Sequence, residues 1–123
     1  CGPEVLCGST RLKAGTAQKM ILNMISTGSM VGTGKAYGNL MVDVQATNEK
    51  LRARARSIVE RACDATEAQA ASVLSQTDGR AKPAIVSLLA DVPVETAESL
   101  LERADGSVRA AVALADPRRK EDR

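Results

Sequence analysis

The chain of 123 residues has no histidine, tryptophan or phenylalanine, and it has a single tyrosine. Without histidine it cannot form a histidine-based catalytic triad or a histidine-rich zinc site. With one aromatic side chain it cannot build a stacking platform for single-stranded nucleic acid. Its chemistry must therefore come from hydroxyl, thiol, carboxylate and basic side chains or from backbone amides.

An excess of charge is also missing, because 17 basic side chains face 15 acidic ones, a net charge of +2. This balance does not favour nucleic acid as a partner. No stretch approaches the roughly 20 apolar residues of a membrane span, and no signal peptide opens the chain, so we expect no membrane partner. The chain begins at Cys1 instead of Met, from which we expect further residues upstream.

Cysteine is scarce as well, with three residues and no CxxC pair. An odd count without a paired motif is typical of a reduced, cytoplasmic protein and not of a disulfide scaffold. We expect Cys63 to be a buried thiol that serves packing.

Apolar residues at helical spacing predict a long helix over residues 12–31, with so narrow a polar stripe that it needs cover on most sides. Residues 32–38, "GTGKAYG", predict a loop, and residues 39–45 a short strand or extended connector. A lone strand cannot pair its own amides, so we expect its partner to lie outside this chain. Thr47 or Asn48 can cap a second helix.

The last third holds an internal repeat at an offset of 27 residues. Each unit reads as a helix, an Asp-Gly turn and a second helix, which predicts four short helices in a compact bundle. The two units match at Ala70 and Ala97, Leu74 and Leu101, Asp78 and Asp105, Gly79 and Gly106, and Ala84 and Ala111.

Local chemistry supports this organisation. Thr66 and Gln69 have the spacing of a capping box. Gly79 and Gly106 can take the left-handed conformation that ends a helix. Pro83 falls near the first turn of the following helix, where its missing amide costs nothing.

The stretch "GSTRLKAGTAQK", residues 8–19, places hydroxyl and basic side chains before the long helix. Ser9, Thr10, Arg11 and Lys13, with the free amides of a helix start, could bind a phosphate or carboxylate. Hydroxyl residues are also common helix caps. On spacing alone both interpretations stay open, and capping is favoured.

The stretches "GPEVLCGSTRLKAGTAQKMILNMISTGSM" and "GKAYGNLMVDVQATNEKL" closely resemble the C-terminal part of N-acetylmuramic acid 6-phosphate etherase, a cytoplasmic sugar isomerase (SIS) family of bacterial peptidoglycan recycling. The match runs from Gly2 to about Leu51. The later helices resemble, less closely, the small ubiquitin-associated-like helical domain that ends this family. The resemblance implies a mainly α chain: the C-terminal piece of an α/β, flavodoxin-like SIS domain over residues 1–45, a connecting helix over 46–65, the helical domain over 66–115 and a charged tail over 116–123.

The resemblance implies a lyase that splits N-acetylmuramic acid 6-phosphate into N-acetylglucosamine 6-phosphate and D-lactate, without a metal or redox cofactor and as a homodimer. The family's catalytic glutamates lie earlier in the SIS domain, so this chain is expected to be inactive alone. Glu4 does not occupy their place in the pattern and is not assigned catalysis. Ser9, Thr10, Arg11 and Lys13 are expected in the sugar-phosphate pocket or in the wall that holds it.

Two other functions remain open. One is a non-catalytic regulator that binds a phosphosugar, because a related regulator of glucokinase shares this architecture and motif. The other is an interaction module in which the repeated helices bind a partner. Two pocket glutamates upstream of Cys1 would separate the etherase from the regulator.

Overall fold

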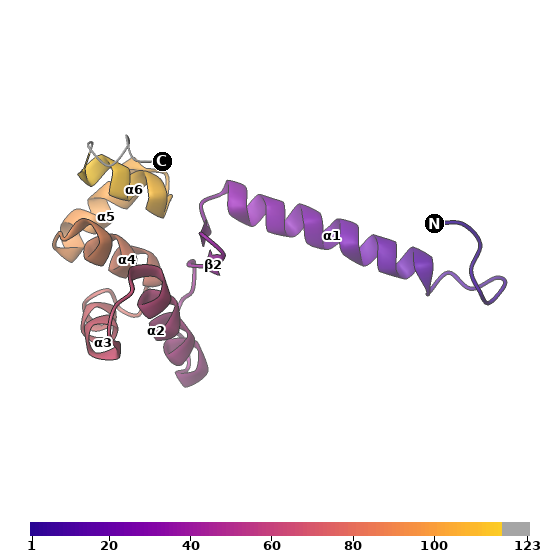
Figure 1. Cartoon of the computed structure of the whole chain (residues 1–123), viewed down its shortest axis with the longest axis horizontal. Helices are drawn as coiled ribbons and strands as arrows, with labels where there is room; N and C mark the ends of the chain where they lie inside the picture. Colours follow the sequence, from indigo (N-terminus) through magenta and orange to yellow (C-terminus); the bar gives the residue numbers. More distant parts are fainter. Residues whose placement is uncertain (117–123) are drawn as a thin grey trace. The chain divides into compact units, whose positions relative to one another are not determined.

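The computed structural model describes residues 1–116 and confirms a mainly helical chain (Figure 1). The predicted tail over residues 116–123 lies outside this range except for Asp116. The elements in chain order are α1 (Lys13–Gly32), β1 (Ala36–Tyr37), β2 (Leu40–Met41), α2 (Glu49–Cys63), α3 (Glu67–Gln76), α4 (Ala81–Ala90), α5 (Val94–Arg103) and α6 (Val108–Ala115). The chain divides into two compact units, Cys1–Gly32 and a second that begins at Thr33.

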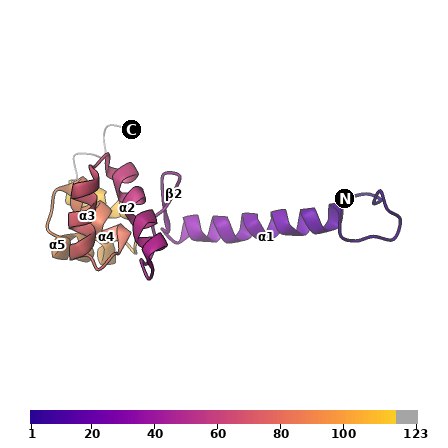
Figure 2. The same ribbon diagram turned by 90° about the horizontal axis from the view of Figure 1, so that it is seen from below.

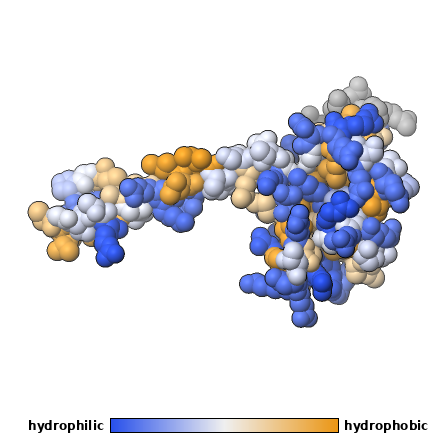
Figure 3. All heavy atoms as spheres, turned by 180° about the vertical axis from the view of Figure 1, so that it is seen from behind, coloured by the Kyte–Doolittle hydropathy of each residue, from blue (hydrophilic) through white to orange (hydrophobic). Residues whose placement is uncertain are grey.

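The first unit consists of α1 and the turn before it. The helix matches the predicted residues 12–31 to within one residue at each end. None of its residues is buried, and its large apolar side chains are exposed, with Met24 at 65% and Leu22 at 63%. Figure 3 shows apolar surface gathered along this helix. The helix therefore presents the broad apolar face that its sequence predicts.

The second unit begins with a hairpin that corrects one prediction. β1 and β2 pair antiparallel, with Ala36 opposite Met41 and Tyr37 opposite Leu40. The partner strand therefore lies inside this chain, within the predicted loop, and the expectation of an outside partner is wrong. Immediately after β2, Val42 is fully buried in the core of the helical bundle.

Helix α4 is the centre of the bundle, because it packs against α2, α3, α5 and α6 (Figures 1 and 2). It supplies Ala84, Ile85 and Val86, all fully buried. Its small and branched side chains allow close helix contacts. The core is completed from the other elements by Val42, Ala55, Ile58, Val59, Ala70, Val73, Leu74, Ala97, Leu100, Leu101, Val108 and Ala111.

The predicted helix boundaries follow from local caps. Asn48 caps α2, and its side-chain oxygen accepts from the amide of Leu51 at 2.9 Å. Thr66 and Gln69 form the predicted capping box at the start of α3. Pro83 lies in the first turn of α4. The four short helices after Thr66 are therefore confirmed.

Candidate functional site: the turn before the first helix

The turn that carries the predicted site residues leads directly into α1. Ser9, Thr10 and Arg11 precede the helix, and Lys13 is its first residue. The amide of Ser9 donates to the carbonyl of Leu6 at 3.0 Å, and the amide of Arg11 donates to the hydroxyl of Ser9 at 3.4 Å. Ser9 is half-buried, whereas the other three residues are exposed.

Glu4 supplies the cap of α1. One of its carboxylate oxygens, Oε2, accepts from the amide of Lys13 at 3.0 Å, and the other, Oε1, accepts from the amide of Ala14 at 3.1 Å. A carboxylate is favoured here because the first amides of a helix have no partner within the helix and the helix dipole is positive at this end. Two of the backbone amides that could have bound a ligand anion are thus occupied by a residue of the chain itself.

Sequence patterns did not reveal this role of Glu4. A capping side chain is usually found within three residues of the amides that it serves. Glu4 lies nine residues before Lys13 and reaches it only because the intervening turn folds back. The one sequence signal for this capping role was that Glu4 is an acidic residue near the start of a predicted helix and had no assigned partner.

Basic and hydroxyl groups remain accessible at the turn. Arg11 forms no ion pair with any residue in the described range, and it borders an open hollow of about 610 Å³. The hollow is lined by Cys1, Arg11, Leu12, Lys13, Thr16, Ala17 and Met20. Lys13, in contrast, donates from its ammonium group to the carbonyl of Pro3 at 2.8 Å. Arg11 is therefore the better placed of the two cations to meet an anionic ligand.

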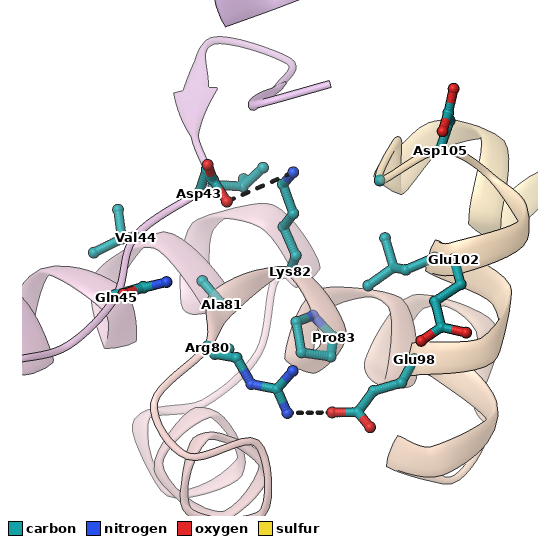
Figure 4. A pocket seen from close by; sticks show the side chains of 13 residues that line it. Asp43, Val44, Gln45, Arg80, Ala81, Lys82, Pro83, Glu98, Glu102 and Asp105 are labelled. Carbon is teal, nitrogen blue, oxygen red and sulfur yellow. Dashed lines mark hydrogen bonds and ion pairs between the residues drawn. The ribbon is translucent and has the colours of Figure 1, made fainter. Parts of the chain in front are cut away.

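A separate cavity of about 530 Å³ lies within the second unit, between the segment after β2 and helices α4 and α5 (Figure 4). Two ion pairs cross it. Arg80 pairs with Glu98, and the ammonium of Lys82 lies 3.7 Å from an oxygen of Asp43. A second lysine, Lys35, lies 3.2 Å from the other oxygen of Asp43. These carboxylates are neutralised by their partners, which is the pattern of structural ion pairs.

The remaining candidate groups offer no further centre. Cys63 is half-buried and packs against the core, whereas full burial was predicted. Partial burial raises the pKa of its thiol to about 11, and its sulfur lies 3.8 Å from the carbonyl oxygen of Ile85. No cluster of three or more cysteine or acidic side chains in residues 1–116 could hold a metal ion. Within the same range, no helix combines the length and apolar character needed to cross a membrane.

Comparison with known families finds a match within the second unit. Residues 38–79 match the family described as the C-terminal lid domain of glucokinase regulatory protein. This region includes β2, α2 and α3.

Similarity to individual proteins extends over almost the whole chain. The chain is 58% identical over 93% of its length to the N-acetylmuramic acid 6-phosphate etherase of Streptomyces avermitilis, of which it covers 37%. It is 62% identical over 90% of its length to that of Rubrobacter xylanophilus, covering 36%, and 54% identical over 95% of its length to that of Vibrio campbellii, covering 38%.

These matches confirm the predicted resemblance to the C-terminal part of N-acetylmuramic acid 6-phosphate etherase. They also extend it beyond Leu51, because they include most of the helical bundle. The chain spans less than two fifths of the length of the curated relatives that it matches.

Proposed function

We propose that this chain is the C-terminal portion of a lyase that cleaves the D-lactyl ether of N-acetylmuramic acid 6-phosphate, giving N-acetylglucosamine 6-phosphate and D-lactate. One observation carries the proposal: the identity of 54–62% with proteins of that name continues through at least 90% of the chain. The acid and base groups of the reaction would lie outside this chain, in the part of the relatives that it does not cover.

The role of this chain would be to help hold the sugar phosphate. A phosphate dianion is well recognised by a guanidinium and by hydroxyl donors. The accessible Arg11, with the hydroxyls of Ser9 and Thr10, provides those groups within three consecutive residues. Lys13 belongs to the wall of the same site. Neither a metal nor a redox cofactor is needed for the binding of an anion by these donors.

In this proposal residues 1–45 complete an SIS domain of α/β, flavodoxin-like architecture, and residues 66–115 are an ubiquitin-associated-like appendage joined by the helix over 46–65. The exposed apolar side chains of α1 support the first part, since such a helix gains stability when another layer covers it. The complete enzyme would act in the cytoplasm as a homodimer. Light scattering of the active protein tests the dimer.

A second function is supported by a different observation. The family that matches residues 38–79 is described as a domain of a regulatory protein, and not as a domain of an enzyme. A non-catalytic protein that binds a phosphosugar is therefore the alternative. It would share the anion-binding turn and differ in the absence of ether cleavage.

A chimera can test the etherase proposal. This chain replaces the corresponding C-terminal part of the Streptomyces coelicolor etherase, to which it is 59% identical over 114 residues. D-lactate release from N-acetylmuramic acid 6-phosphate is then measured. We expect a kcat/KM within about tenfold of that of the parent enzyme, because most contacts across the junction would be retained.

Two controls make the result decisive. The parent enzyme without its C-terminal part should be inactive, and a chimera that carries the matching segment of a glucokinase regulatory protein should also be inactive. A folded chimera of this chain that binds the sugar phosphate without releasing D-lactate would contradict the etherase proposal and favour the regulator.

A further inference from the structure

The turn before α1 is closed at its neck by three hydrogen bonds. Two of them join the Glu4 carboxylate to the amides of Lys13 and Ala14, at 3.0 and 3.1 Å. The third runs in the reverse direction, from the ammonium of Lys13 to the carbonyl of Pro3 at 2.8 Å. Glu4 thus holds the backbone of Lys13 and Ala14, and Lys13 holds the backbone of Pro3, the residue before Glu4. We call Glu4 and Lys13 the clasp.

The clasp fixes the ends of a loop that has few other restraints. Inside the loop, one backbone hydrogen bond connects Ser9 to Leu6, and the Ser9 hydroxyl accepts from Arg11. Most of the loop residues are exposed, whereas Glu4 is half-buried. A loop with exposed side chains and few internal contacts depends on its ends for order. Its conformation should therefore depend on the clasp.

Neither clasp residue is suited to hold the phosphate itself. The negative charge of Glu4 would repel a phosphate, and its oxygens already occupy the first amides of α1. The ammonium of Lys13 is directed to the backbone of Pro3. Thr10 and Arg11, between them, are exposed.

We infer that Glu4 is a positioning residue of the sugar-phosphate site, which acts with Lys13 to hold the loop that presents Thr10 and Arg11 to the ligand. This inference rests on the proposed function. It assigns Lys13 to the supporting wall and not to direct contact. Holding donors in place before binding favours affinity, because the ligand then need not order the loop.

Hydrogen exchange in the full chain tests the clasp without any assay of activity. The amides of Lys13 and Ala14 should exchange at least about tenfold faster in Glu4→Ala, because their acceptors are removed. Glu4→Gln keeps one carbonyl oxygen and should show a smaller increase, about threefold. Glu49→Ala is the matched control: Glu49 is an acidic residue at the start of another helix, α2, and its loss should leave both amides unchanged. Unchanged exchange in Glu4→Ala would overturn the inference.

Kinetics of the chimera then separate positioning from catalysis. Glu4→Ala should raise KM about tenfold and change kcat by no more than about threefold, with Glu4→Gln closer to the parent chimera. Arg11→Ala, which removes a ligand donor, should raise KM without altering the exchange of the Lys13 amide. A large fall in kcat at unchanged KM in Glu4→Ala would contradict a positioning role. If the unsubstituted chimera releases no D-lactate, the proposed function fails, while the exchange experiment still decides whether the clasp exists.

Discussion

Gly79 and Gly106 occupy equivalent places in the two helical repeats and share one backbone conformation, with φ of +75° at each. Each amide donates to the carbonyl of the leucine five residues earlier, Leu74 or Leu101, at 2.9 Å. Their surroundings differ. A Cβ added at Gly79 would lie 2.9 Å from the Cβ of Ala46, whereas one at Gly106 would approach only the Lys82 ammonium, at 3.6 Å.

This difference predicts unequal costs for the same substitution. Gly106→Ala should lower the free energy of unfolding by about 1 kcal/mol, the cost of a left-handed alanine. Gly79→Ala should cost about 2–4 kcal/mol, because overpacking against Ala46 is added. Urea unfolding followed by the fluorescence of Tyr37, the single aromatic residue, measures both changes.

A double-mutant cycle identifies the cause. Ala46→Gly should recover at least about 1 kcal/mol in the Gly79→Ala background and nothing in the Gly106→Ala background. Equal costs at the two glycines, or no coupling between positions 46 and 79, would show that the close approach to Ala46 does not limit substitution.

Much of the helical bundle could be predicted because its signals are local. The Asp-Gly turns, the capping box at Thr66 and the apolar spacing of α2 each involve residues within five positions of one another. The internal repeat added a second copy of the same pattern. These features require no knowledge of distant partners, and the structure confirms them.

The features that were missed depend on distant residues. β1 is only two residues long and lies in a glycine-rich stretch. So short a strand shows no alternation of apolar and polar residues that would have predicted its pairing with β2. Glu4 reaches α1 across nine residues, and Asp43 meets Lys82 across 39. Position along the chain does not reveal such contacts. The assignment of Ser9, Thr10, Arg11 and Lys13 to the sugar-phosphate pocket or its wall stays a prediction.

Asp43 forms ion pairs with two lysines, and comparing them tests whether distance or burial decides the strength of an ion pair. Lys35 is the nearer lysine, at 3.2 Å, but its side chain is 45% exposed; Lys82 is at 3.7 Å and only 17% exposed. Screening by water weakens exposed pairs, so the Asp43–Lys82 coupling should be the larger, at about 0.5–1 kcal/mol against less than about 0.5 kcal/mol for Lys35. Double-mutant cycles with Asp43→Asn, Lys82→Met and Lys35→Met measure both coupling energies. Salt at 0.5 M, roughly a fivefold rise in ionic strength, should reduce the Asp43–Lys35 coupling more than the Asp43–Lys82 coupling. A larger coupling for Lys35 would show that distance decides.

The start of α3 predicts a cost for one exposed glutamine. The side-chain oxygen of Gln69 accepts from the amide of Thr66 at 2.9 Å, so Gln69→Ala leaves that amide without its partner. We expect a loss of about 0.5–1 kcal/mol in the free energy of unfolding. In α6 the residue three positions after the capping Ser107 is Ala110. The amide of Ser107 already donates to the carbonyl of Ala104. Ala110→Gln should therefore change stability by less than about 0.3 kcal/mol, and a gain of the size lost at Gln69 would contradict this account.

The reactivity of the three thiols should separate by burial. Cys1 and Cys7 are exposed, whereas desolvation raises the pKa of Cys63 from 9.0 to about 11. At pH 8 the folded chain should therefore show two readily alkylated thiols and a third that reacts about 100-fold more slowly, because only the thiolate attacks. Urea should make all three react alike. Mass spectrometry after timed alkylation measures this, and rapid labelling of Cys63 in the folded chain would contradict its raised pKa.

The same pKa makes stability depend on pH in a defined direction. The pKa of Cys63 is higher in the folded chain than its ordinary value of 9.0, so the folded state keeps the proton where the unfolded state loses it. The stabilisation contributed by the neutral, half-buried thiol is therefore complete below pH 9 and is lost as the pH rises toward about 11. Cys63→Ala removes this contribution, while all other ionisable groups are the same in both proteins. The difference in free energy of unfolding between wild type and Cys63→Ala should thus change in favour of the variant between pH 8 and 10.5, by up to about 1 kcal/mol, less than the full shift would give because the thiol is only half-buried. A difference that does not vary with pH would show that the surroundings of Cys63 do not favour the neutral thiol.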